Sequence, residues 1–183
     1  MRPTQSLAGI LLTVAIALSG AVGTTANAEP NHLCTDAAYR TEMLNLHNDY
    51  RATHHAPKLQ LDEKLNRLAE DWAQRLARTH TFEHRPDNKF GENLYMMSGN
   101  GGTFAGAESA FRAWADEEEA VYDYDKPGFS METGHFTQVV WKGTERMGVA
   151  RACEPETGET YVVANYDPPG NWEGRFPENV LRP

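Results

Sequence analysis

The chain has 183 residues, with 17 Lys or Arg, 26 Asp or Glu and a formal net charge of −9. An acidic surface of this kind repels nucleic acid and anionic lipid headgroups over most of its area, which argues against a nucleic-acid-binding function. The length is that of one ordinary domain, which can bury its own core without many cross-links.

The first 28 residues predict a secretory signal peptide. Arg2 is their only charge, an apolar stretch covers residues 7–22, and the small triplet Ala26-Asn27-Ala28 follows. The alternative, a retained membrane anchor, is disfavoured because Gly and polar residues interrupt a stretch that is shorter than the roughly 20 residues needed to span a bilayer. We therefore expect cleavage after Ala28 and a single secreted, extracellular domain over residues 29–183 with no transmembrane anchor. In a Gram-negative source the compartment would be the periplasm.

Cys34 and Cys153 are the only two cysteines of the chain. Because export leads to an oxidising compartment, we expect them to form a disulfide. The alternative is two separate buried thiols, since the sequence does not show whether their Cβ atoms come within bonding distance.

Two helices are predicted in the first part of the mature chain. Thr35-Asp36 is a good N-cap pair before apolar residues at helical spacing, which predicts a helix that ends near His54. Asp62 marks the start of a second helix with one apolar face, expected to run to about Arg78. His47, beside an apolar position of the first helix, is interpreted as a structural histidine bonded to a nearby loop.

The helical pattern breaks between residues 79 and 94. We expect a loop there that carries His84 and Glu92, because loops on a rigid scaffold often carry function. The Gly-rich stretch 98–106 is expected to be a surface turn, since no Lys-Ser/Thr follows it as a phosphate-binding loop would require.

A third helix is expected from Ala107 to about Val121. Glu117 falls on the same face as the apolar Ala110 and Trp114, so the periodicity places it in a core-facing stripe. Its acidic neighbours turn away and are expected in solvent. Because a buried carboxylate needs a cation or several donors, Glu117 is a candidate functional residue, and the alternative is a carboxylate at the rim of the stripe.

The last third of the chain predicts a small sheet. Residues 135–141 suit either a strand or a short buried helix. Residues 147–152 and 161–166 are clearer strands, joined as a hairpin by a Pro-Glu-Thr-Gly turn. Separate helix and strand runs favour an α+β layered sandwich.

Among the seven histidines, His84 and His135 stand out because they lie at loop positions beside Pro86 and Gly134. No HExxH pair or Cys-His cluster accompanies them, so the spacing alone does not establish a metal site. Nucleophilic hydrolysis is not supported, because the chain has no G-x-S-x-G motif and neither cysteine lies in a catalytic context.

Three segments are distinctive: Gly-Glu-Asn-Leu at 91–94, Gly-His-Phe-Thr-Gln-Val-Val-Trp at 134–141 and Tyr-Val-Val-Ala-Asn-Tyr-Asp-Pro-Pro-Gly-Asn at 161–171. With His-Asn-Asp-Tyr-Arg at 47–51, they resemble the motifs of the CAP superfamily (cysteine-rich secretory protein, antigen 5 and pathogenesis-related 1). The resemblance covers residues 36–181 and is greatest to the Golgi-associated, plant-pathogenesis-related-1-like branch. It implies a three-layer α-β-α sandwich, the CAP or SCP fold.

The resemblance also implies a central cleft lined by two histidines and two glutamates, which carry over to His84, Glu92, Glu117 and His135. The resemblance implies that the two histidines could bind a divalent ion, with zinc as the first candidate. The alternative is a cleft that has no constitutively bound ion. This chain has Ala164 where many secreted members have a cysteine, and it lacks the disulfide-rich C-terminal extension of venom members. Ion-channel toxicity is therefore not implied.

Three functions remain open. The first is a binding module for a sterol, a fatty acid or a protein partner. The second is a metal-dependent, protease-like hydrolase in which Glu92 or Glu117 is the catalytic base. The third is a purely structural tetrad in a host-interaction or defence protein. Binding is favoured over hydrolysis, because two histidines are one fewer than the usual three protein ligands of catalytic zinc.

Overall fold

The computed structural model describes residues 32–99 and 103–183. The predicted signal peptide, residues 1–28, lies outside the described residues, as do residues 100–102 of the Gly-rich stretch. The helices and strands are, in chain order, α1 Ala37–Thr53, β1 Gln60–Leu61, α2 Glu63–Thr79, β2 Gly91–Met97, α3 Ala107–Trp114, α4 Asp116–Glu119, α5 Gly134–Val139, β3 Arg146–Cys153, β4 Thr160–Asp167 and α6 Phe176–Asn179.

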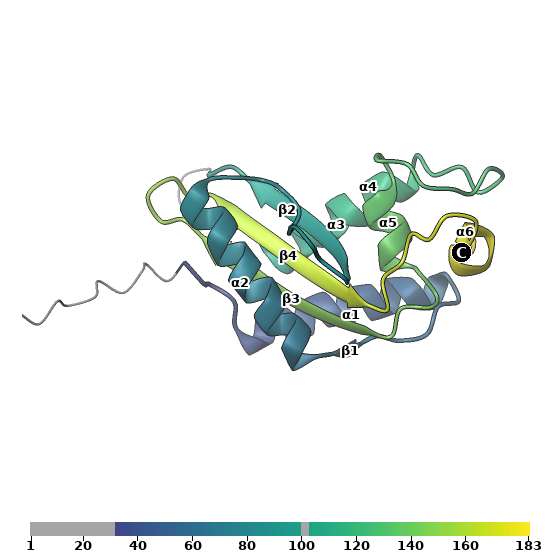
Figure 1. Ribbon diagram of the computed structural model, residues 1–183, viewed down its shortest axis with the longest axis horizontal. Helices are drawn as coiled ribbons and strands as arrows, with labels where there is room; N and C mark the ends of the chain where they lie inside the picture. The colour runs from purple at the N-terminus through teal and green to yellow at the C-terminus, as the bar shows by residue number, and fades with distance from the viewer. Residues whose placement is uncertain (1–31, 100–102) are drawn as a thin grey trace, which may run out of the picture.

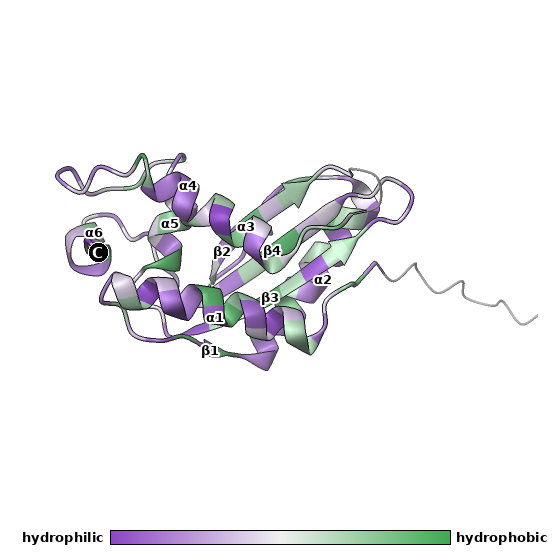
Figure 2. Ribbon diagram, turned by 180° about the vertical axis from the view of Figure 1, so that it is seen from behind, coloured by the Kyte–Doolittle hydropathy of each residue, from purple (hydrophilic) through white to green (hydrophobic). Residues whose placement is uncertain are grey.

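The strands form one sheet in the order β1, β3, β4, β2. β1 pairs with β3 in parallel, and the other two pairings are antiparallel. α2 covers one face of the sheet (Figure 1), and α1 and α3 lie on the opposite face, which is seen from behind (Figure 2). The predicted α-β-α sandwich is confirmed.

The core has two parts because β4 is buried on both faces. Alternate side chains of a strand point to opposite faces. Val162 and Ala164 accordingly belong to the cluster on the α1 and α3 side, whereas Tyr161 and Val163 belong to the cluster under α2.

α2 forms where the sequence predicts it. The Asp62 side chain caps the helix by accepting hydrogen bonds from the N–H groups of Lys64 and Leu65, at 2.8 and 3.0 Å. Its first turn lies directly on β3 at Gly148, where a Cβ atom would be 2.2 Å from the backbone nitrogen of Asn66. Only a residue without a side chain permits this approach.

The predicted disulfide between Cys34 and Cys153 is confirmed. The backbone around it is paired as well, because the Cys34 N–H donates to the Arg151 carbonyl at 3.2 Å and the Cys153 N–H donates to the His32 carbonyl at 2.8 Å. The segment that precedes α1 is thereby fastened to the end of β3.

The prediction of one continuous third helix over residues 107–121 is wrong. α3 ends at Trp114, and Ala115 adopts φ −103° and ψ −74° before the four-residue α4 begins. The backbone changes direction there, so residues after Ala115 no longer continue the apolar stripe of α3. Val121, near which the third helix was expected to end, is 63% exposed.

The structure decides three further expectations. The loop predicted up to Leu94 ends earlier, because β2 begins at Gly91 and pairs with β4 along its whole length. Glu92 and Asn93 are two consecutive polar residues, so the sequence lacks the alternation of polar and apolar residues that is typical of a strand. Both side chains face partners inside the protein. The ambiguous segment 135–141 is mostly helical, as α5, and the predicted hairpin is confirmed as β3 and β4.

Candidate functional site

Glu92 provides the buried carboxylate of the site. It lies on β2, opposite Asn165 of β4, and its side chain is 4% exposed. One carboxylate oxygen accepts hydrogen bonds from Nδ1 of His84 at 2.8 Å and from the Arg85 N–H at 3.0 Å. The other accepts from the side-chain amides of Asn88 at 3.2 Å and Asn165 at 3.4 Å. These donors compensate the desolvation of a charge that would otherwise be costly to bury.

His84 lies in the loop before β2, with 63% of its side chain exposed. The hydrogen bond to Glu92 raises the pKa of the imidazole, and partial burial opposes this effect. Because Nδ1 faces a carboxylate, the neutral ring carries its proton on Nδ1 and leaves Nε2 as an acceptor. His84 and Glu92, which the sequence places in one expected cleft, are thus in direct contact.

His135 is paired with Glu118, not with Glu117. Its Nδ1 and a Glu118 carboxylate oxygen form a hydrogen bond. The other oxygen accepts the backbone N–H groups of His135 at 2.9 Å and Phe136 at 3.0 Å. Glu118 thus closes the N-terminus of α5, where the preceding Thr133 makes no side-chain cap, and a carboxylate is favoured there by the exposed N–H groups.

The prediction that Glu117 faces inward is therefore wrong, and its side chain is exposed. The periodicity argument assumed that the helix continued without interruption, whereas the break at Ala115 changes which acidic residue of α4 faces α5. The run Asp116-Glu117-Glu118-Glu119 indicates that a carboxylate of this segment lies close to the site. A run of four acidic residues does not show which of them it is.

Asn93 is a site residue that the sequence analysis did not single out. Its amide nitrogen donates to the His135 carbonyl at 3.2 Å and to the Tyr166 hydroxyl at 3.3 Å. The same hydroxyl bonds Nε2 of His47 at 2.9 Å, and Nδ1 of His47 bonds the Met43 carbonyl at 2.8 Å. His135 is consequently held by α4 on one side and by a buried chain of hydrogen bonds on the other.

His47 is structural, as predicted, but its partners are a helix carbonyl and a strand tyrosine rather than a loop. Its side chain is fully buried, and desolvation lowers the pKa of the imidazole to about 4. The neutral ring therefore serves as a fixed donor and acceptor in the core at neutral pH.

The two histidine–glutamate pairs meet at a cleft of about 400 Å³. It lies between the start of β2, the start of α5 and the connection that follows α4. Its rim carries three large exposed apolar side chains: Phe82 (54% exposed), Phe129 (52%) and Met131 (83%). The complete lining is Phe82, Glu83, His84, Glu92, Asn93, Leu94, Phe129, Met131, Gly134, His135 and Asn171.

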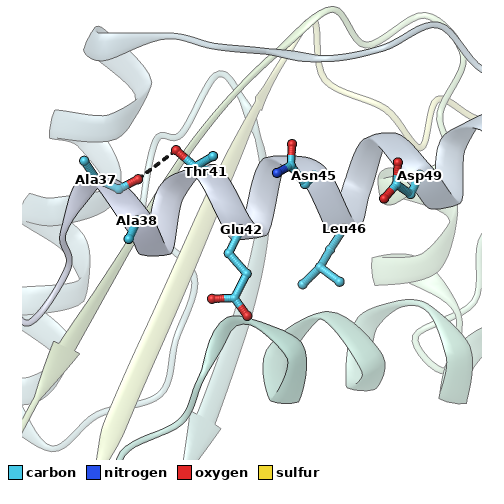
Figure 3. A pocket seen from close by; sticks show the side chains of 7 residues that line it. All are labelled: Ala37, Ala38, Thr41, Glu42, Asn45, Leu46 and Asp49. Carbon is cyan, nitrogen blue, oxygen red and sulfur yellow. Dashed lines mark hydrogen bonds between the residues drawn. The ribbon is translucent and has the colours of Figure 1, made fainter.

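A second hollow, of about 570 Å³, follows the outer side of α1 and is lined only by residues of that helix (Figure 3). Figure 3 shows Glu42 and Leu46 pointing towards the neighbouring helix α3, and the one hydrogen bond drawn there is the local bond from the Thr41 hydroxyl to the Ala37 carbonyl. No histidine or cysteine lines it. Of these two hollows, only the cleft around His84 and His135 has histidines in its lining.

The cleft provides part of the donor set of a zinc site. Nδ1 of each cleft histidine is bonded to a carboxylate, which is the usual arrangement behind a metal-bound imidazole and leaves Nε2 free to bind an ion. Within residues 32–99 and 103–183, however, no three His, Cys, Asp or Glu side chains are grouped so that they could hold a metal ion. The described residues offer two imidazole ligands and do not fit a three-ligand zinc site.

The chain is similar to known proteins over most of its length. The model of the cysteine-rich secretory protein family, CAP, matches residues 44–166. Golgi-associated plant pathogenesis-related protein 1 of Homo sapiens is 41% identical over 150 residues, which cover 79% of this chain and 94% of that protein. Secreted protein RBT4 of Candida albicans is 34% identical over 160 residues, covering 81% of this chain but only 42% of that protein. A crystal structure of NaASP2 with Zn²⁺ is 26% identical, with a TM-score of 0.64 over 85% of this chain and 91% of that one.

Proposed function

We propose, because this chain belongs to the cysteine-rich secretory protein (CAP) family, that it is a binding module whose cleft takes a small lipid-like ligand. The observation that carries the proposal is the cleft itself, with an apolar rim over a polar floor of two histidine–glutamate pairs. Its volume of about 400 Å³ lies in the range of small-molecule sites.

The rim supports an apolar ligand. Phe82, Phe129 and Met131 come from two separate segments of the chain and line one cleft, whereas exposed apolar residues of a soluble protein are usually scattered. Phe129 also packs on the first turn of α5, since a Cβ atom at Gly134 would lie 3.0 Å from its ring. A sterol or a hydrocarbon chain placed here would cover these side chains.

A divalent metal is the second part of the proposal. His84 and His135 would bind the ion through Nε2, while Glu92 and Glu118 hold the two rings from behind. Because the described residues contribute no third side-chain ligand, the other coordination positions of the ion would be left to solvent or to a ligand. The related NaASP2 structure contains Zn²⁺, and this supports zinc as the first ion to test.

The location proposed for the protein is outside the cell. Residues 1–28 have the pattern of a signal peptide, the Cys34–Cys153 disulfide is typical of oxidising compartments, and RBT4 is named as a secreted relative. Among the helices of the described residues, none is long and apolar enough to cross a membrane.

The test is a titration of the EDTA-treated protein with a fluorescent sterol and with a neutral long-chain alcohol. Replacing both Phe129 and Met131 by Ser should weaken the binding of each ligand by about tenfold, because about 1.4 kcal/mol of apolar contact corresponds to that factor. Val121→Ser is the matched control, since Val121 is 63% exposed but does not line the cleft. Unchanged binding in the double variant, or no binding by the unaltered protein, would overturn the proposal.

The hydrolase and protein-partner alternatives are tested on the same preparation. Peptidase turnover that is lost in Glu118→Gln but persists in Glu117→Gln would show that the protein is an enzyme and would contradict the proposed binding module. Capture of a protein partner that depends on Phe129 and Met131 would show that the rim binds a protein and not a small ligand.

A further inference from the structure

A side pocket of about 360 Å³ adjoins the cleft. Asn171 belongs to the lining of both. Asn88 lines the side pocket and donates a hydrogen bond at 3.2 Å to Glu92, which lines the cleft. A ligand that extends past Asn171 therefore passes from the cleft into the side pocket.

Trp172 is an exposed aromatic platform in the side pocket. The residue is 60% exposed, and its ring N–H donates to the Pro169 carbonyl at 2.9 Å. Because this donor is already engaged, the surface that the indole offers to a ligand is apolar ring carbon.

The segment that carries Trp172 is fastened to α5, the helix that also borders the cleft. The Gly170 N–H donates to the side-chain oxygen of Gln138 at 2.8 Å. The Asn171 side chain donates to the Gly134 carbonyl at 2.8 Å and accepts from the Thr137 hydroxyl at 2.6 Å. The side pocket and the cleft are thus held together by one helix, so little ordering of the chain is needed for a ligand to contact both.

The polar groups of the side pocket suit hydroxyl groups. Asn88 and Asn171 each use one N–H and one lone pair of the amide in bonds within residues 32–99 and 103–183, and each keeps a second N–H and a second lone pair. Lys89 is exposed at the same pocket, and its ammonium forms no ion pair with the described residues. Hydroxyl groups both donate and accept, so they match this mixture of donors and acceptors.

We propose that the ligand of the cleft is an amphiphile with a hexose head, whose sugar ring stacks on Trp172 in the side pocket while its apolar body lies against the rim of the cleft. A pyranose has a face of C–H groups, which packs on an aromatic ring, and a perimeter of hydroxyl groups, which bond Lys89 and the two asparagines. This inference rests on the proposed function, because it assumes that the cleft binds the apolar body, and it names the class of the ligand.

The first test separates the contributions of the tail and the sugar. Octyl glucoside, octanol and methyl glucoside are titrated by calorimetry into EDTA-treated protein, below the micelle concentration of octyl glucoside. Octyl glucoside should bind about tenfold more tightly than octanol, a difference that corresponds to about 1.4 kcal/mol, because it contacts both the cleft and Trp172. Methyl glucoside, which has no tail, should bind more weakly than octyl glucoside.

Tryptophan fluorescence locates the sugar. The other three tryptophans, Trp72, Trp114 and Trp141, are at most 4% exposed, so acrylamide in solution quenches mainly Trp172. Octyl glucoside should protect Trp172 from the quencher. Decanol, which has a longer tail but no sugar, should leave the quenching unchanged.

Two variants with a control assign the contacts. Trp172→Ala should weaken octyl glucoside binding about tenfold and leave octanol binding unchanged, whereas Trp172→Tyr, which keeps a ring, should retain most of the affinity. Phe104→Ala is the matched control, because Phe104 is 36% exposed and lines neither the cleft nor the side pocket. Thermal unfolding checks that each variant is folded.

The outcomes separate the two proposals. Equal affinities of octyl glucoside and octanol, undiminished octyl glucoside binding in Trp172→Ala, or equal protection of Trp172 by decanol would overturn the sugar inference and leave the binding module intact. If neither octanol nor the fluorescent sterol bound, the binding module would fall and the sugar inference with it.

Discussion

The Glu118 carboxylate bonds Nδ1 of His135 with one oxygen and caps the first turn of α5 with the other. One side chain of α4 thus fixes both the orientation of a cleft imidazole and the helix that carries it. The stability of α5 and the geometry of the cleft are therefore coupled through a single residue.

We expect Glu118→Gln to lower the free energy of unfolding by about 1–2 kcal/mol, because it removes a charged acceptor from three donors. Glu117→Gln makes the same chemical change on an exposed neighbour and should stay within about 0.5 kcal/mol of the unaltered protein. Urea unfolding of both variants measures the difference, and equal losses would show that Glu118 does not hold α5.

The metal proposal predicts that zinc binding depends on both cleft histidines. Calorimetric titration of the His84→Ala, His135→Ala double variant should show most zinc binding lost. His80→Ala is the control, since His80 is half exposed, bonds Glu159 and does not line the cleft. Undiminished zinc binding in the double variant would remove the metal from the proposal.

His47 predicts that stability rises with pH between about 4 and the ordinary histidine value of 6.5. Its pKa is lowered in the folded protein by burial, so the unfolded chain binds the extra proton first and acid favours unfolding in this window. A shift of that size corresponds to about 3 kcal/mol, which is present above pH 6.5 and is lost as the pH falls towards 4. Denaturation midpoints measured at several pH values test this slope.

The matched variant is His47→Gln, which keeps polar groups but does not titrate. It should be less stable at neutral pH and should show a smaller change between pH 4 and 6.5. His84 acts in the opposite sense and at higher pH: its pKa is raised, so its contribution is present below about 6.5 and is lost as the pH rises through the folded value. An unaltered slope in His47→Gln would assign the acid sensitivity to other groups.

Gly148 predicts a large steric effect of one methyl group. In Gly148→Ala the Cβ atom would lie 2.2 Å from backbone atoms of α2, so the helix must move away from β3. We expect a loss of about 2–3 kcal/mol by thermal or urea unfolding. Gly128→Ala is the control, because nothing lies within 4 Å of its Cβ position, and a similar loss there would contradict the packing argument.

Much of the fold could be predicted because its signals are local. The N-cap Asp62 and the apolar face behind it define α2, and the Pro-Glu-Thr-Gly turn between two apolar runs defines the β3–β4 hairpin. The pairing of Cys34 with Cys153 followed from their number and the expected compartment. The resemblance of the motifs at 91–94, 134–141 and 161–171 was enough to bring His84, Glu92 and His135 into one site.

What only the tertiary structure decided depends on contacts between segments far apart in the chain. The backbone changes direction at Ala115, and helical periodicity does not predict this change. As a result Glu118, and not Glu117, is the acidic residue that bonds His135. β2 is recognised as a strand only from its pairing with β4. Its polar residues Glu92 and Asn93 do not follow a strand pattern in the sequence, because they bond His84, His135 and Tyr166. The apolar rim likewise required Phe82 to lie near Phe129 and Met131, because side chains separated by more than 40 positions become one surface only when the chain is folded.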